Sequence, residues 1–210
     1  MQEKYQETFN TWNKIAQLYE GIFMDLTLYN DTYTIFSEAI KKKDASILEI
    51  GCGPGNITQH LSKLLPDSNI LATDVSQNMI TLAQKNNPKA TCAVMDCRNI
   101  TQLDQQFDGI MCGFIIPYLS KNDCAKFITD CYNLLSENGI LYLSFVAGKY
   151  TDSGFISGST GDRAYFYYHE LETIQTALQA NNFQVFSSVE KEYIKSDGSV
   201  EIHTILNAKK

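Results

Sequence analysis

An α/β fold with a mostly parallel sheet is predicted by two patterns along the chain. From residue 46 onward, short apolar runs alternate with segments of helical period, which is typical of parallel strands joined by crossover helices. Near the C-terminus, two apolar runs flank the segment from Ser196 to Ser199, whose central Asp197-Gly198 is typical of a hairpin turn. We therefore expect a parallel sheet that is finished by an antiparallel C-terminal hairpin.

The expected strands are short and apolar, as is usual for strands that helices cover on both faces. The parallel strands are expected at 47–50, 69–73, 91–95, 109–114 and 140–146, and the hairpin strands at 183–194 and 200–206.

Amphipathic helices are expected between these strands. One carries Ile57, Leu61, Leu64 and Leu65 on a single face, and another carries Cys124, Phe127, Ile128, Cys131, Leu134 and Leu135. Ser120 and Asp123 resemble a capping box at the start of the second helix, and Asn138-Gly139 provides its stop signal.

Before the first expected strand, apolar and aromatic residues recur at spacings of three and four. The stripe consists of Phe9, Trp12, Ala16, Tyr19 and Phe23. It favours an N-terminal helical cap, which either packs on the core or closes a ligand pocket, and the two roles are compatible. The three lysines at 41–43 are expected to end a later helix, where cations complement the helix dipole.

Length and charge limit the class of protein. A chain of 210 residues fits one domain, and its net charge of −7 opposes nucleic acid as a partner, because phosphate affinity depends largely on Lys and Arg. The most apolar stretch, 109–119, is too short for a membrane helix, and the first ten residues are too polar for a signal peptide. We expect a cytoplasmic monomer or homodimer that does not bind membranes.

No metal site is expected. The six cysteines form no C-x-x-C pair and lie mostly in apolar segments, and the three histidines are scattered along the chain. Buried, reduced thiols explain this pattern of cysteines.

The segment 47–58 reads as a strand, a glycine turn and the start of a helix. Glu49 is followed by glycines at alternate positions, Gly51, Gly53 and Gly55, and glycines let a backbone approach a ligand closely. A glycine turn alone is weak evidence for a ligand site.

Two aspartates strengthen this interpretation. Asp74 ends the next apolar run, 23 residues after Gly51, and Asp96 ends the third, 22 residues further on. Ligands of open parallel sheets bind at the carboxyl ends of the strands, so the turn and both acids should meet in space. Asp74 is placed to accept hydrogen bonds from the hydroxyls of a ribose. Asp96, with the neighbouring backbone of Cys97, is placed to accept a hydrogen bond from an adenine amino group. The alternative for either acid is a helix cap or a turn residue.

These motifs, E-x-G-x-G-x-G, T-D-V-S-x-x-M and M-D-C, resemble those of class I S-adenosyl-L-methionine (SAM)-dependent methyltransferases over residues 45–148. The resemblance implies a Rossmann-like three-layer sandwich with a seven-stranded sheet, SAM as cofactor, and S-adenosyl-L-homocysteine (SAH) as product. It implies cofactor contacts by Gly51, Cys52 and Gly53 to the methionine part, Asp74 to the ribose, Val75 and Met79 to the adenine ring, and Asp96 to the adenine amine. Cys112 and Gly113 match positions that face the cofactor and the substrate mouth.

The resemblance also implies that the N-terminal helices lie over the cofactor. Tyr19 is the candidate contact there, through its phenol or by stacking, although it is equally compatible with packing against Trp12. A nicotinamide or flavin site is the main rival for the glycine turn, with the fingerprint G-x-G-x-x-G. Asn56 occupies the position of its last glycine, which favours the methyltransferase interpretation.

Candidate catalytic residues come from the substrate side. His169 follows an aromatic-rich segment and is a candidate general base, with a surface histidine as the alternative, while His60 and His203 are less favoured. Tyr118 is a candidate for lining the substrate pocket. The sequence Ile115-Ile116-Pro117-Tyr118 keeps only the end of the Asn-Pro-Pro-Tyr motif of enzymes that methylate amide or exocyclic nitrogens, which argues against those acceptors.

We therefore divide the single domain 1–210 into a helical cap (1–43), a cofactor-binding core (44–148), a lid loop (149–168), and a helix with the closing hairpin (169–210). The predicted function is methyl transfer from SAM to a small-molecule acceptor, with O- or C-methylation of an aromatic or lipid-like metabolite favoured. A non-catalytic SAM-binding module and a NAD-dependent oxidoreductase are the alternatives.

Overall fold

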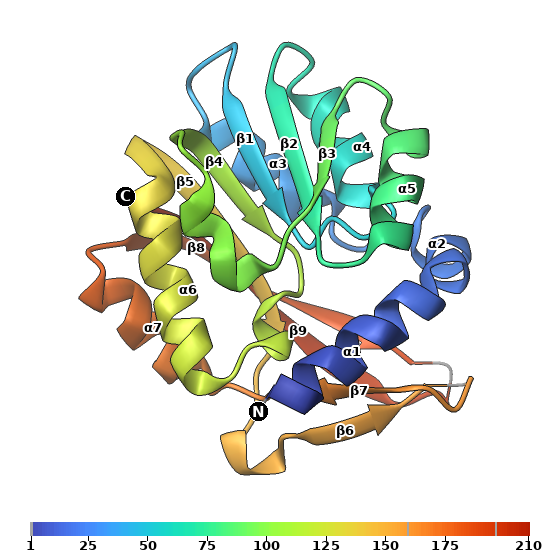
Figure 1. Cartoon of the computed structure of the whole chain (residues 1–210). Helices are drawn as coiled ribbons and strands as arrows, with labels where there is room; N and C mark the ends of the chain where they lie inside the picture. Colours follow the sequence, from blue (N-terminus) through green and yellow to red (C-terminus); the bar gives the residue numbers. More distant parts are fainter. Residues whose placement is uncertain (1, 159, 196) are drawn as a thin grey trace.

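The computed structural model describes residues 2–158, 160–195 and 197–210, and its centre is a seven-stranded sheet in the order β3-β2-β1-β4-β5-β9-β8 (Figure 1). The parallel strands are β1 (Ser46–Ile50), β2 (Asn69–Asp74), β3 (Thr91–Val94), β4 (Phe107–Cys112) and β5 (Leu135–Val146). The antiparallel pair is β8 (Gln184–Ile194) and β9 (Val200–Lys209). The predicted fold class is confirmed.

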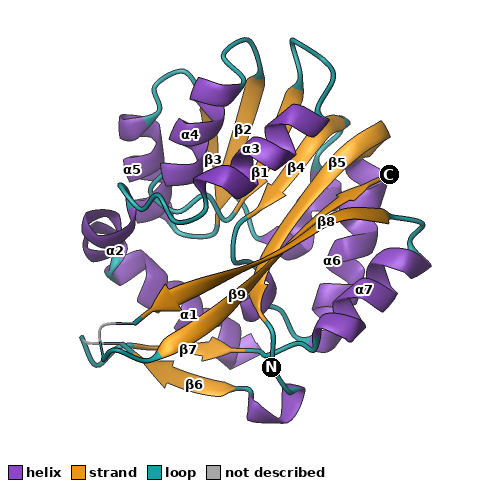
Figure 2. Ribbon diagram, turned by 180° about the vertical axis from the view of Figure 1, so that it is seen from behind, coloured by secondary structure: helices purple, strands orange, loops and turns teal. Residues whose placement is uncertain are grey.

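Helices cover both faces of the sheet, which gives the three layers (Figures 1 and 2). One face is covered by α6 (Lys121–Leu134) and α7 (Leu171–Ala180), and the other by α3 (Asn30–Ala39), α4 (Asn56–Leu64) and α5 (Gln77–Asn86). Alternate strand residues point to opposite faces, so Leu48 packs with Phe127 of α6, whereas Ile47 packs with Phe36 of α3.

The N-terminal cap consists of two helices, α1 (Gln2–Lys14) and α2 (Ala16–Phe23). Ile15 leaves the helical conformation between them, with φ −93° and ψ 11°. The aromatic stripe continues across the break, because Trp12 and Tyr19 pack edge to face with ring centroids 5.5 Å apart. The stripe therefore predicted the shared face correctly but not the break in the helix.

The segment 149–168, expected to be a loop, contains regular structure, and that part of the prediction is wrong. After the short helix η3 (Tyr150–Asp152), the strands β6 (Gly154–Ser157) and β7 (Arg163–Phe166) form a two-stranded antiparallel sheet. The Oγ1 of Thr11 in α1 donates to the carbonyl of Arg163 at 2.7 Å, and the Tyr165 N–H donates to Thr8 Oγ1 at 2.9 Å. Contacts with α1 thus order residues whose glycine and serine content suggested a loop; Ser159 lies outside the described residues.

Two other expectations need correction. The helix α3 ends at Ala39 and Ile40 is already extended, so lysines 41–43 follow the helix and do not form its last turn. The strand β5 begins at Leu135, directly after α6, because Leu135 pairs with Phe107 of β4.

In the β8–β9 turn, the Gly198 N–H donates to the Lys195 carbonyl, which supports the predicted hairpin, while Ser196 is outside the described residues. No helix in the described part of the chain is long and apolar enough to cross a membrane.

Candidate functional site

A pocket lies at the carboxyl ends of β1, β2, β3 and β4, beneath the cap helices α1 and α2. Ten of the predicted site residues line it: Tyr19, Gly51, Gly53, Asp74, Val75, Met79, Asp96, Cys97, Gly113 and Tyr118. Ten further residues complete the wall: Tyr5, Thr8, Phe9, Trp12, Ile50, Met95, Arg98, Phe114, Ile115 and Leu119. The glycine turn and the two aspartates do converge in space, as the strand-end rule predicts.

The glycine turn requires glycine for steric and conformational reasons. Gly51 has φ +72°, and a Cβ at this position would lie 2.0 Å from Cδ1 of Ile115. Gly53 has φ +54°, and its N–H donates to Oδ2 of Asp74 at 3.0 Å. Side chains are therefore kept away from the floor of the pocket, and the turn is joined to the end of β2.

The Asp74 carboxylate is held on both sides. Besides the Gly53 N–H on Oδ2, the Ser76 N–H donates to Oδ1 at 2.8 Å, and Ser76 in turn caps α5 by accepting from the Met79 N–H. Burial raises the pKa of Asp74, while these backbone N–H groups oppose that rise. Asp74 is therefore both a turn residue, which was the alternative to a ligand contact, and part of the pocket wall.

Glu49 lies beneath the turn and outside the pocket wall, with 1% of its surface exposed. Thr58 Oγ1 donates to Oε2 at 2.6 Å, but Oε1 has no hydrogen-bond partner among the described residues. Burial raises the pKa of Glu49 to about 8. An unpaired buried carboxylate oxygen is costly, so this site favours a cation nearby.

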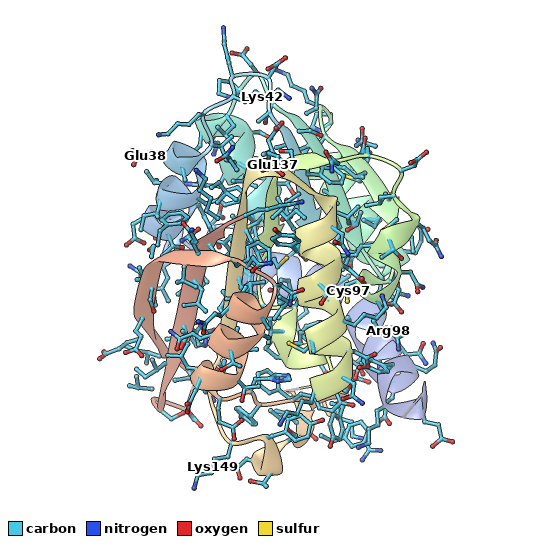
Figure 3. The ribbon with its side chains drawn as sticks, turned by 90° about the vertical axis from the view of Figure 1, so that its left-hand side faces the viewer. Glu38, Lys42, Cys97, Arg98, Glu137 and Lys149 are labelled. Carbon is cyan, nitrogen blue, oxygen red and sulfur yellow. The ribbon has the colours of Figure 1, made fainter. Side chains whose placement is uncertain are left out.

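Asp96 is engaged by Arg98, which the sequence analysis did not single out. The Arg98 Nε lies 3.0 Å from each oxygen of the Asp96 carboxylate, and the guanidinium centre lies 4.0 Å over the ring of Tyr5 in α1. Figure 3 shows Cys97 and Arg98 beside α6 on the side where α1 lies. Through Arg98, the end of β3 is joined to the cap. The ion pair also occupies part of the Asp96 carboxylate, which leaves it less able to accept hydrogen bonds from a ligand.

Aromatic side chains line the rest of the pocket, and we call the residues Trp12, Tyr19, Phe114 and Tyr118 the aromatic wall. Tyr19 adjoins the glycine turn, because a Cβ on Gly53 would lie 3.6 Å from its ring, and Trp12 and Tyr19 pack with Met79. The ring centroid of Trp12 lies 5.5 Å from that of Tyr19 and 5.6 Å from that of Tyr118, both nearly edge to face. Burial raises the pKa of Tyr118 well above its ordinary value, so its phenol keeps its proton at neutral pH. Two sequence signals pointed to this wall, the N-terminal stripe for Trp12 and Tyr19 and the segment 115–118 for Tyr118, whereas Phe114 was not predicted.

Besides Glu49, three predicted cofactor contacts lie behind the pocket and not in its wall. Cys52 and Cys112 are buried in the core, at 2% and 0% exposure. Gly55 has φ +89°, and a Cβ there would lie 2.2 Å from Asn87 Nδ2, so its role is to let the turn pack against the end of α5. The motif spacing did not distinguish residues that face the pocket from neighbours that face the core.

His169 does not lie where a general base would be needed, and it is not on the surface either. It is 2% exposed, its Nε2 donates to the carbonyl of Leu119 at 2.9 Å, and it does not line the pocket. Burial lowers its pKa. These contacts give His169 a structural role between Leu119 and the end of β5, next to which it forms a bridge with Ala147.

Comparison with known proteins agrees with this geometry. Residues 47–139 match the family model described as "Methyltransferase domain". The chain is 36% identical over 101 residues to a malonyl-[acyl-carrier protein] O-methyltransferase of Bacillus cereus, which covers 47% of this chain and 36% of the relative. It is 30% identical over 185 residues to the enzyme of the same name in Priestia megaterium, covering 80% of this chain and 65% of the relative. The chain thus spans less than two thirds of each curated relative.

A solved structure extends the likeness to nearly the whole chain. An S-adenosylmethionine-dependent methyltransferase from Clostridium acetobutylicum superposes with a TM-score of 0.70 at 18% identity, covering 94% of this chain and 98% of that one. At this identity the likeness concerns the fold alone. Residues 47–139 thus match the methyltransferase-domain family, and the fold over most of the chain is that of a class I SAM-dependent methyltransferase.

Proposed function

We propose that this protein transfers a methyl group from SAM to a small-molecule acceptor with an aromatic or lipid-like body. The observation that carries the proposal is that fixed carboxylates, a glycine turn and a set of aromatic rings line one and the same pocket. When bound, SAM supplies an electrophilic methyl group on a positively charged sulfur.

The polar end suits the cofactor. Asp74 is held rigidly enough to accept two ribose hydroxyls, and the unpaired Oε1 of Glu49 suits the ammonium of a methionine moiety near the turn. The carboxylate of Asp74, and that of Glu49 once it is ionised, match the positive charges on the sulfonium and ammonium groups of SAM. Val75 and Met79 line the pocket next to Asp74, as an adenine ring would require.

The aromatic wall suits the acceptor. Among the described residues that line the pocket, Arg98 is the only lysine or arginine, and it is already paired with Asp96. An acceptor carboxylate would therefore find no free cation in this wall, whereas a neutral ring or an acyl chain would replace water against Trp12 and Tyr118. We accordingly favour a neutral acceptor for O- or C-methylation.

The contribution of the protein to the reaction is positioning. Holding an acceptor and a methyl donor at near-attack distance supplies roughly 7 to 11 kcal/mol of the barrier lowering. Trp12, Tyr19 and Tyr118 are suited to this, because each is packed against an edge-to-face neighbour.

Two measurements test the proposal. Calorimetry should detect SAH binding, and methyl-labelled SAM should label small molecules in a metabolite extract when the protein is added. Binding without transfer would support a non-catalytic module. A thermal shift with NAD in place of SAH would support an oxidoreductase and overturn the cofactor assignment.

A further inference from the structure

Next to the aromatic wall lies a hydrogen-bonded set of side chains that we call the Tyr29–His203–Glu201 chain. The hydroxyl of Tyr29 lies 2.6 Å from Nδ1 of His203, and Nε2 of His203 lies 3.0 Å from Oε2 of Glu201. An ionised carboxylate only accepts hydrogen bonds, so the neutral ring carries its proton on Nε2. The Tyr29 hydroxyl must then donate to Nδ1, so both hydrogen bonds run in the same direction, from Tyr29 through His203 to Glu201.

The environment keeps the imidazole neutral and the carboxylate charged. Tyr29 and His203 are each 6% exposed, and Tyr193 of β8 stacks on His203 with ring centroids 5.1 Å apart. Burial lowers the pKa of His203. Burial opposes ionisation of Glu201, but hydrogen bonds from Lys195 and His203 outweigh it and lower the pKa of this carboxyl.

Phe114 connects this chain to the pocket. Its ring is part of the aromatic wall, and its centroid lies 4.8 Å from that of His203 and 5.4 Å from that of Tyr29. The backbone of Phe114 has φ +57°, a conformation that residues other than glycine adopt rarely and that is found at functional sites. The Tyr29 hydroxyl and the acceptor end of the pocket are therefore separated by one aromatic side chain.

We propose that Tyr29 is a catalytic residue that accepts the proton of a neutral hydroxyl acceptor, with Phe114 turning aside to admit that acceptor, and that His203 and Glu201 position and relay this proton. The inference rests on the proposed function and narrows it to O-methylation of a protonated hydroxyl.

Methyl transfer to a hydroxyl exchanges one bond to the methyl carbon for another and moves two protons. The acceptor oxygen forms a bond to the methyl carbon as the carbon–sulfur bond breaks, and the electron pair of that bond stays on sulfur. The acceptor proton passes to the Tyr29 oxygen while the phenolic proton of Tyr29 passes to Nδ1 of His203. The resulting imidazolium is stabilised by the Glu201 carboxylate, in the manner of a general base oriented by a third group.

Two probe acceptors distinguish proton transfer from a structural role. We compare para-cresol with para-nitrophenol, at a pH where the first is protonated and the second ionised, using methyl-labelled SAM. Tyr29→Phe, His203→Gln and Glu201→Gln should each reduce transfer to para-cresol, by about 100-fold or more for Tyr29→Phe. Transfer to para-nitrophenol should stay within about threefold, because an ionised oxygen needs no base.

His60→Gln is the matched control, because His60 packs on Tyr33 and is not part of the Tyr29–His203–Glu201 chain. This variant should methylate both phenols as the unaltered protein does. If His203→Gln does not fold, Tyr29→Phe carries the test, because it removes one oxygen and keeps the buried ring. SAH affinity measured by calorimetry should be unchanged in Tyr29→Phe.

The outcomes separate the two proposals. Equal loss with both phenols, or no loss with either, overturns the relay and leaves the proposed function intact. Transfer to metabolites in an extract but to neither phenol overturns the hydroxyl acceptor and the relay with it. Failure of the unaltered protein to bind SAH, or to transfer methyl to any acceptor, overturns the proposed function and the relay together.

Discussion

The two ends of the pocket are built from different parts of the chain. The polar end comes from one continuous region, residues 49–98, in which three successive strands each end in a glycine turn or an acid. The aromatic wall comes from α1, α2 and the residues after β4, and the Tyr29–His203–Glu201 chain adds the start of α3 and the strand β9.

This difference shows what each end depends on. At the polar end, backbone N–H groups fix the carboxylate of Asp74, so its geometry follows from the turn itself. At the aromatic end, rings hold one another across segments more than 100 residues apart, as in the pair Trp12 and Tyr118. Substitutions at the polar end should therefore act on cofactor affinity, and those at the aromatic end on acceptor turnover.

The largest expected effect on cofactor affinity is at Asp74. Asp74→Ala removes a charge-assisted acceptor worth about 1.5 to 3 kcal/mol, so SAH affinity should fall about tenfold or more. Calorimetry measures this, with Asp104→Ala as the control, because Asp104 is an exposed acid outside the pocket. Unchanged affinity in Asp74→Ala would contradict the assigned role.

Gly51→Ala should destabilise the fold by about 1 to 3 kcal/mol, since its Cβ would meet Ile115 at 2.0 Å and its φ of +72° strains alanine. Denaturant unfolding measures the change. Gly21→Ala is the matched control in α2: no atom lies within 4 Å of its Cβ, so a gain of about 0.5 to 1 kcal/mol is expected. Equal stabilities of the two variants would refute the steric argument.

Glu49 should make cofactor binding depend on pH. Its pKa in the free protein is raised to about 8, so it is largely protonated below that pH, whereas a bound ammonium favours the carboxylate. SAH affinity should therefore rise as pH increases toward 8, by at most about tenfold per pH unit. Glu49→Gln should remove that dependence, and a pH series by calorimetry that shows the same slope in both proteins would exclude the coupling.

The smallest effect is expected at Tyr118. Its phenol stays protonated because burial raises its pKa, so we assign it a role in the shape of the pocket, despite its candidacy as a catalytic residue. Tyr118→Phe keeps the ring and should change methyl transfer by less than about threefold. A loss of tenfold or more in a labelled-methyl assay would instead indicate a hydroxyl that acts in the reaction.

Much of the polar end was predictable because strand ends of a parallel sheet meet at one edge. The strand order placed Gly51, Asp74 and Asp96 together as expected. The same reasoning could not separate Cys112, which faces the core, from Gly113, which lines the pocket. Whether a residue at the end of a strand faces the core or the pocket depends on where the strand stops, and a shift of one residue reverses its direction.

Arg98 and the aromatic end were not predictable in the same way. The Arg98–Asp96 pair adjoins a predicted acid, but the ring of Tyr5 that supports the guanidinium comes from the other end of the chain. The sequence favoured His169 over His203 as a general base, because His169 follows an aromatic-rich segment. In the structure their neighbours differ: a carbonyl of Leu119 for the first, and a phenol with a carboxylate for the second.

Local patterns were enough to predict the sheet, the closing hairpin and the glycine turn with its two aspartates, because these follow from periodicity, backbone conformation and the rule for strand ends. The tertiary structure alone decided which side chains face the pocket, how β6 and β7 join α1, and which histidine gains an acid and a phenol. These features depend on contacts between segments distant in the chain, and no short-range pattern encodes the partner of a side chain.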